Sequence, residues 1–95
     1  VAACDEEFAL RAHEMWGITL QRASNPDESV KVLTEGLTFA TDGSREHLTL
    51  RYHIARAYEM AERAEAAQEI YQDICDVNEG FLDVKKRRDE LAGVL

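Results

Sequence analysis

The chain has 95 residues, with 11 Lys and Arg against 19 Asp and Glu, which gives a formal net charge of −8. This length favours one domain rather than two, and the acidic balance disfavours general nucleic-acid binding because a phosphate backbone would be repelled. The two Cys cannot build a disulfide framework, and no apolar run approaches the roughly 18 residues of a membrane span, so we expect no direct membrane insertion.

Hydrophobic periodicity predicts an all-α fold of about five helices. The first begins near Asp5 and ends at the break before Pro26. Its apolar residues recur at steps of four, four, four and three, which makes one stripe on a helix: Phe8, Ala12, Trp16, Leu20 and Ala23. The second helix is expected over residues 26–40, with Asn25 as its N-cap.

Three more helices are expected after the break at residues 41–44, where Ser44 is a cap candidate. They cover residues 45–60, 64–77 and 81–92. In the last one, Arg88 stands where an apolar residue is expected, and its stem can lie on apolar neighbours while its head reaches water. No segment alternates with period two, so we expect no strand.

An internal repeat links the first two helices to the next two. Five pairs of residues match at one common offset of 38 positions: Gly17 and Ala55, Leu20 and Tyr58, Ser29 and Ala67, Leu33 and Tyr71, Leu37 and Cys75. In both copies a small residue on the first helix precedes a small residue on the second by 12 positions. Small residues of this kind allow paired helices to approach closely.

The second copy resembles the tetratricopeptide repeat family. Residues 54–60, Ile-Ala-Arg-Ala-Tyr-Glu-Met, are similar to the core of that family's first helix, and Ala67 and Tyr71 match its second helix. Residues 74–81 read like its helix end and exit loop, although Glu79 stands where the family has Pro. The first copy matches at fewer positions, and the copies are four residues further apart than the family's spacing of about 34, an excess that we place in residues 41–47.

The resemblance implies antiparallel helix hairpins of a right-handed α-solenoid. We expect a single domain over residues 1–95, with repeat one at about 10–43, repeat two at about 48–81 and a capping helix at about 81–95. Because the chain begins at Val1 rather than Met, we expect it to be a segment of a longer protein. Two repeats are fewer than the three or so that stability normally demands, so we expect either further repeats upstream or a homo-oligomer that associates through Phe8, Trp16 or Val30.

The resemblance also implies a groove, lined by the first helix of each repeat, that holds a peptide or a helix of a partner protein. The corresponding positions are Arg11, Glu14, Ile18 and Gln21 in the first copy and Thr49, Tyr52, Arg56 and Glu59 in the second. Tyr52 and Arg56 lie one turn apart, a spacing that suits a joint aromatic and cationic contact. The Lys and Asn residues with which some family members clamp a carboxyl terminus are missing here, which disfavours that mode of binding.

An acidic series extends over the second repeat at steps of three or four residues: Glu59, Glu62, Glu65, Glu69, Asp73 and Asp76. Two interpretations stay open, ordinary solubilising charge and a strip that attracts a basic partner. The basic run at residues 85–88 spreads around its helix, which favours a solvated face over a nucleic-acid patch.

No residue pattern in the chain is typical of an enzyme. We find no Gly-rich phosphate loop, no Ser elbow and no Cys/His pairing. His13, His47 and His53 lack metal-ligand spacing, and Cys75 falls on a buried stripe. We therefore expect no cofactor, no metal and no catalysis, and we interpret the chain as a protein-interaction module or scaffold.

Two alternatives stay open. The run Val1-Ala2-Ala3-Cys4 matches a bacterial lipoprotein processing box, which allows a lipid-anchored envelope assembly factor with this fold instead of a cytoplasmic protein. A regulatory domain fused to an enzyme is the other alternative.

Overall fold

Residues 2–94 fold into five α-helices and one short 3₁₀ helix. The computed structural model describes residues 2–94, and side chains are described for residues 7–93. The elements are α1 (Ala2–Arg22), α2 (Pro26–Gly36), η1 (Leu37–Phe39), α3 (Arg45–Met60), α4 (Ala64–Val77) and α5 (Val84–Val94). No strand occurs between residues 2 and 94, so the all-α prediction is confirmed.

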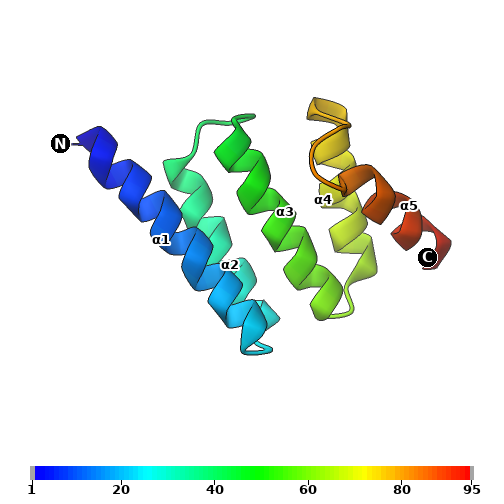
Figure 1. Cartoon of the computed structure of the whole chain (residues 1–95). Helices are drawn as coiled ribbons and strands as arrows, with labels where there is room; N and C mark the ends of the chain where they lie inside the picture. The colour runs from blue at the N-terminus through cyan, green and yellow to red at the C-terminus, as the bar shows by residue number, and fades with distance from the viewer. Residues whose placement is uncertain (1, 95) are drawn as a thin grey trace.

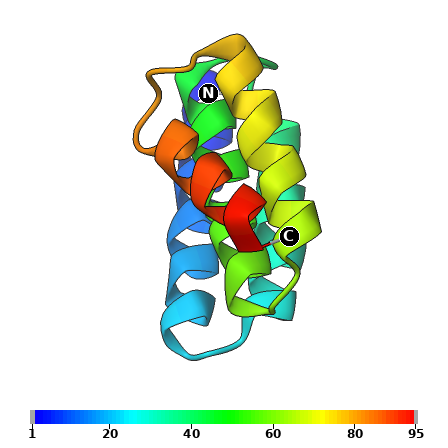
Figure 2. The same ribbon diagram turned by 90° about the vertical axis from the view of Figure 1, so that its right-hand side faces the viewer.

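The helices pack in chain order, each mainly against the next, and a smaller contact joins α1 to α3. In Figures 1 and 2, α1 and α3 lie in one layer and α2 and α4 in the other, while α5 crosses at the carboxyl-terminal end. The molecule measures 47 × 29 × 16 Å, which makes it long and thin. Two helix hairpins, α1–α2 and α3–α4, therefore lie side by side.

The buried side chains form two clusters rather than one central core. One cluster joins α1, α2 and α3 through Leu10, Leu33, Leu50 and Ile54. The other joins α3, α4 and α5 through residues that include Leu48, Tyr71, Ile74, Val84 and Leu91. Tyr58 and Ile70 pack against both clusters, so these two half-buried side chains connect the hairpins.

Matched residues of the 38-position offset lie at buried positions within both hairpins. A Cβ atom added to Gly17 would lie 2.4 Å from Leu33, so only Gly fits between α1 and α2 there without a shift. The hydroxyl of the fully buried Ser29 donates a hydrogen bond of 2.7 Å to the carbonyl of Gly17. In the second hairpin, Ala55 and Ala67 are likewise fully buried.

Helix boundaries agree with the sequence prediction for α3 and α4 and differ for the other three. The first helix begins at Ala2 rather than near Asp5. The second stops at Gly36, and the predicted remainder becomes η1. The last begins at Val84 rather than Phe81, because Leu82 adopts a left-handed conformation with φ of 46° that a helix cannot contain.

The two predicted N-caps differ in outcome. The Ser44 side chain accepts a hydrogen bond of 3.2 Å from the backbone N–H of His47, which confirms it as the cap of α3. Asn25 precedes α2 as expected but makes no side-chain cap bond. Pro26 at the first helical position instead removes one of the amides that would need a partner.

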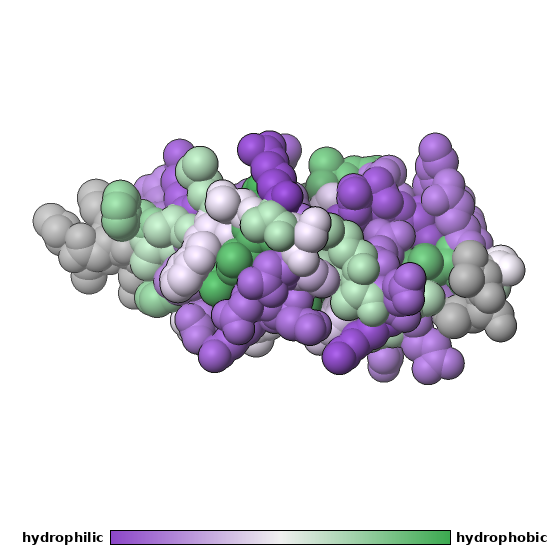
Figure 3. Space-filling view, turned by 90° about the horizontal axis from the view of Figure 1, so that it is seen from below, coloured by the Kyte–Doolittle hydropathy of each residue, from purple (hydrophilic) through white to green (hydrophobic). Residues whose placement is uncertain are grey.

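None of the described helices is both long enough and apolar enough to cross a bilayer. Figure 3 shows one face of the molecule, on which hydrophobic residues form separate areas that hydrophilic residues interrupt.

Candidate functional site

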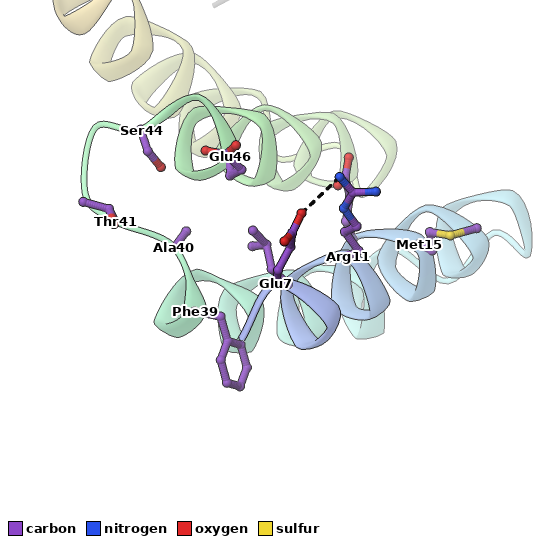
Figure 4. Close-up of a pocket in the computed structure, with 10 residues that line it drawn as sticks. Glu7, Arg11, Met15, Phe39, Ala40, Thr41, Ser44 and Glu46 are labelled. Carbon is purple, nitrogen blue, oxygen red and sulfur yellow. Dashed lines mark ion pairs between the residues drawn. The ribbon is translucent and has the colours of Figure 1, made fainter. Parts of the chain in front are cut away.

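A hollow with a volume of about 560 Å³ lies between the amino-terminal halves of α1 and α3. Its lining comes from α1, from η1 with the connection that follows, and from the start of α3: Glu7, Leu10, Arg11, Glu14, Met15, Phe39, Ala40, Thr41, Ser44 and Glu46. Figure 4 shows Glu7 and Arg11 projecting from α1 into the space that faces the start of α3. The hollow is therefore a feature of the layer that α1 and α3 share.

The connection between the two hairpins forms one end of the hollow. After η1, Ala40 is extended, with φ of −110° and ψ of 145°, and the chain turns through Gly43 at φ of 77° before α3 begins. Gly suits that left-handed turn because it has no Cβ. This is the stretch in which the sequence places the extra residues between the two repeats.

The hollow combines acidic charge with apolar surface. Arg11 pairs with Glu7 at 3.3 Å, and both side chains are exposed. The opposite wall carries Glu46, for which no ion pair is found among the described side chains. With one Arg against three Glu among its lining residues, the hollow is negative, and Leu10, Met15 and Phe39 supply apolar atoms.

Glu14 faces a histidine of α3 rather than a permanent cation. Its Oε1 lies 3.7 Å from Nε2 of His53 on α3. Burial lowers the pKa of His53 below its usual 6.5; Glu14 opposes this shift and Arg56 adds to it. At neutral pH the imidazole is therefore mainly uncharged and adds little positive charge to this wall of the hollow.

Of the four groove residues predicted on α1, two line the hollow. Arg11 and Glu14 are part of its wall. Gln21 lies further along the helix, where its amide donates a hydrogen bond of 2.9 Å to the carbonyl of His53 and one of 3.3 Å to Ser29. This side chain ties α1 to α3, and Ile18 between these positions is half-buried.

None of the four groove residues predicted on α3 lines the hollow. Tyr52 is 9% exposed, and its hydroxyl donates a hydrogen bond of 2.6 Å to Asp83. The cation over its ring is Arg87, at 5.9 Å from the centroid, rather than a partner's group or Arg56. Asp83, just before α5, and Arg87 of α5 therefore cover the tyrosine that we expected to share a surface with Arg56. Thr49 is half-buried, and its hydroxyl bonds to the backbone of its own helix.

Glu59 belongs to the same network rather than to an open groove. Its Oε2 accepts a hydrogen bond of 2.5 Å from the hydroxyl of Tyr71 and lies 3.5 Å from Arg87 and 3.7 Å from Arg56. Burial, together with the hydrogen bond to Glu59, raises the pKa of Tyr71 well above its usual range. The tyrosine therefore stays protonated and donates to the carboxylate.

Arg87 joins this network to the last helix. Its Nε donates to the hydroxyl of Tyr52 at 3.0 Å and to Asp83 at 2.9 Å. Burial opposes the charge on Asp83, but the hydrogen bond from Tyr52 and the charge of Arg87 outweigh it and hold the pKa of that carboxyl below its usual value. These contacts bind α5 to α3, and they explain why Tyr52 and Glu59 face α5 instead of an open groove.

The hollow contains residues that the sequence reasoning missed, and a simple extension would have found two of them. Glu7 lies one turn before Arg11, and Glu46 lies one turn before Thr49, so both continue the predicted stripes toward the amino end. Phe39 lies in η1, within the stretch predicted as the second helix, whereas Thr41 and Ser44 come from the connection, for which the helical periodicity gives no signal.

The remaining sequence candidates lie outside the hollow. Cys75 is buried, and burial raises the pKa of its thiol. In the part of the chain with described side chains, no group of three or more His, Cys, Asp or Glu residues is arranged to hold a metal ion. Arg88 is half-buried and bonds to Asp89 and Gln72. The side chain of Cys4 lies outside the described residues.

The acidic series of the second repeat is divided by the fold. Glu62, Glu65 and Glu69 are exposed, whereas Glu59 belongs to the network around Arg87 and Asp73 pairs with Arg51 at 3.1 Å.

Comparison with known proteins identifies no relative: no family model matches the chain, and no curated protein or solved structure matches it significantly.

Proposed function

We propose that this chain is a protein-interaction module that binds a segment of a partner protein in the hollow between α1 and α3. The two hairpins are then tetratricopeptide-like repeats of a right-handed α-solenoid, and α5 closes the second one. The observation that carries this proposal is the hollow itself, which is lined by acidic side chains from both hairpins and by apolar side chains from the first hairpin and η1.

The lining favours a partner segment with both basic and apolar residues. Glu14 on α1 and Glu46 on α3 place carboxylates on different walls, and Leu10, Met15 and Phe39 add apolar atoms to the lining. A peptide or a helix with Lys or Arg beside a large apolar residue satisfies both kinds of surface. Because the carboxylates are partly exposed, we expect the binding to weaken as the salt concentration rises.

A selection from a displayed peptide library tests this function. We expect the unmodified chain to enrich peptides that combine basic and apolar residues. We expect the Glu46→Lys variant to bind the same peptides with an affinity lower by a factor of about ten or more. The matched control is Glu28→Lys, since Glu28 is also an exposed Glu in the first turn of a helix but lies outside the hollow. Equal loss of binding in both variants would overturn the assignment to the hollow.

The cytoplasmic location, the lipid anchor at Cys4 and the lack of catalysis stay predictions. The mass of the protein isolated from its natural source would test the lipid anchor, because lipidation of Cys4 adds the mass of the acyl groups.

A further inference from the structure

The outer face of α1 carries an uncharged stripe that no described residue covers. Phe8, Met15 and Trp16 are 76%, 69% and 54% exposed. At helical spacing they share one side of α1 with three small residues, all exposed: Ala12, Thr19 and Ala23. The Thr19 hydroxyl donates to the backbone carbonyl of Met15 at 2.8 Å, so its polar group is satisfied within the helix.

The repeat indicates what this stripe is suited for. Moving 38 positions along the chain takes Ala12 to Leu50, Trp16 to Ile54 and Thr19 to Ala57. These three α3 residues are at most 5% exposed, and Leu50 and Ile54 pack against Leu33 in the first hairpin. The stripe on α1 is therefore the counterpart of the α3 surface that packs against a neighbouring hairpin.

The other end of the molecule does not offer a matching surface. Val84 and Leu91 of α5 are buried in the cluster with α4, which covers the end of the second hairpin. The outward residues of α5 are charged and exposed: Lys85, Lys86, Asp89 and Glu90. Stacking of copies head to tail would bury these charges, so an open chain of copies is disfavoured.

From these observations we infer that two copies of this chain associate through antiparallel pairing of their α1 stripes around a two-fold axis. An axis between Met15 and Trp16 sets Phe8 of each copy opposite Ala23 of the other, a large side chain against a small one. The same axis places the small Ala12 beside Thr19 and brings Met15 next to Trp16 at the centre. The match of Phe8 with Ala23 favours close packing of the two helices. The pairing also brings together uncharged surfaces of two molecules that each carry a net charge of −8.

Trp16 lies beside the axis, so the two copies of its ring come next to each other. Within one molecule the ring is 6.2 Å from that of His13, which in turn is 5.4 Å from Phe39. This aromatic group extends the uncharged face toward η1. Because Trp16 is the only Trp in the chain, its fluorescence reports on this surface alone.

Sedimentation equilibrium and Trp16 fluorescence over a range of protein concentrations test the inference. We expect the mass to rise from one copy to two and then to stop, and the emission to shift to shorter wavelength over the same range as water leaves the ring. A monomer at every concentration would overturn the inference, as would a mass that grows without limit.

A matched pair of variants locates the interface. Ala12→Glu places a carboxylate in the stripe without touching the core, and we expect it to weaken association about tenfold or more. Ala92→Glu makes the same change at an exposed Ala of α5 and leaves association unchanged. Association that survives Ala12→Glu, or that is lost equally in both variants, would contradict the α1 interface. The inference does not depend on the proposed peptide site, which the Glu46→Lys variant tests separately.

Discussion

The two hairpins share one register but fill it with different side chains. In the first, Gly17 leaves no space for a Cβ because Leu33 occupies it, and the Ser29 hydroxyl bonds across the gap. In the second, Ala55 takes the place of Gly17 and the larger Tyr71 takes the place of Leu33, with both fully buried. The register of a helix pair is therefore kept by alternating small and large positions rather than by particular residues.

The hairpins also differ in what covers them. The second is closed by α5, which Arg87 and Asp83 tie to Tyr52 and Glu59 of α3. The first has no such cover among the described residues, and its outer helix keeps Phe8 and Trp16 exposed. The second hairpin is thus covered by a helix of its own chain, whereas the outer side of α1 remains available to another molecule.

The largest effect is expected where the first hairpin is most tightly packed. Leu33→Ala removes a side chain with no exposed surface and leaves a cavity against Gly17, so we expect a loss of about 2–5 kcal/mol in the free energy of unfolding. Urea unfolding at a fixed protein concentration measures it. Val77→Ala is the control, since Val77 is 60% exposed and its truncation should change stability by no more than about 0.5 kcal/mol. Equal losses in the two variants would contradict this packing.

Because α1 and α2 approach closely at Gly17, we expect Gly→Ala changes at two positions to alter the free energy of unfolding in opposite directions. Gly17→Ala inserts a Cβ into Leu33 and should destabilise the fold by about 1–3 kcal/mol. Gly93→Ala in α5 meets nothing within 4 Å, so the better helix propensity of Ala should stabilise the fold by up to about 1 kcal/mol. Thermal unfolding of both variants gives the signs. A stabilising Gly17→Ala change would show that the helices are further apart than described.

The tie between α5 and the second hairpin is tested at Arg87. The Arg87→Met variant leaves Asp83 without its base and Glu59 with Arg56 alone, and we expect it to cost about 1–3 kcal/mol in the free energy of unfolding. Hydrogen exchange should show faster exchange in α5 while α1 keeps its protection. The control is Lys85→Met, whose ion pair with Glu79 is exposed and contributes at most about 0.5 kcal/mol. Unchanged exchange in α5 after Arg87→Met would argue against the network.

The smallest effect is a pH dependence at the contact between the hairpins. The folded protein holds the pKa of His53 below its usual 6.5, so below that pH the unfolded chain binds more protons than the folded one. The free energy of unfolding should therefore fall as the pH drops from 6.5 through the folded pKa. His53→Gln should show a smaller fall in urea titrations at successive pH values. If the free energy of unfolding falls equally with pH in the variant, His53 is not the group responsible for the pH dependence.

Sequence periodicity predicts the fold class and the bounds of α3 and α4, because their apolar stripes end at clear breaks. It does not predict the end of α2, where residues 37–39 tighten into a 3₁₀ turn, or the late start of α5 after Leu82. Both depend on backbone conformations that the apolar pattern does not encode.

The candidate site is predictable only in part, for a related reason. Arg11 and Glu14 follow from the stripe of their helix, and both line the hollow. Tyr52 has the same spacing on α3, but its exposure depends on the path of α5, a contact 31 residues away in the chain. One end of the hollow is formed by the connection after η1, in which Thr41 and Ser44 have no periodic signal.

The most direct test of the proposed function is to map where a bound peptide contacts the chain. Titration of a ¹⁵N-labelled sample with a selected basic and apolar peptide should shift the amide resonances around Glu7, Glu14 and Glu46, from both walls of the hollow. Shifts confined to the exposed acidic residues of α4, such as Glu65 and Glu69, would contradict the account and would place the partner on the second hairpin instead.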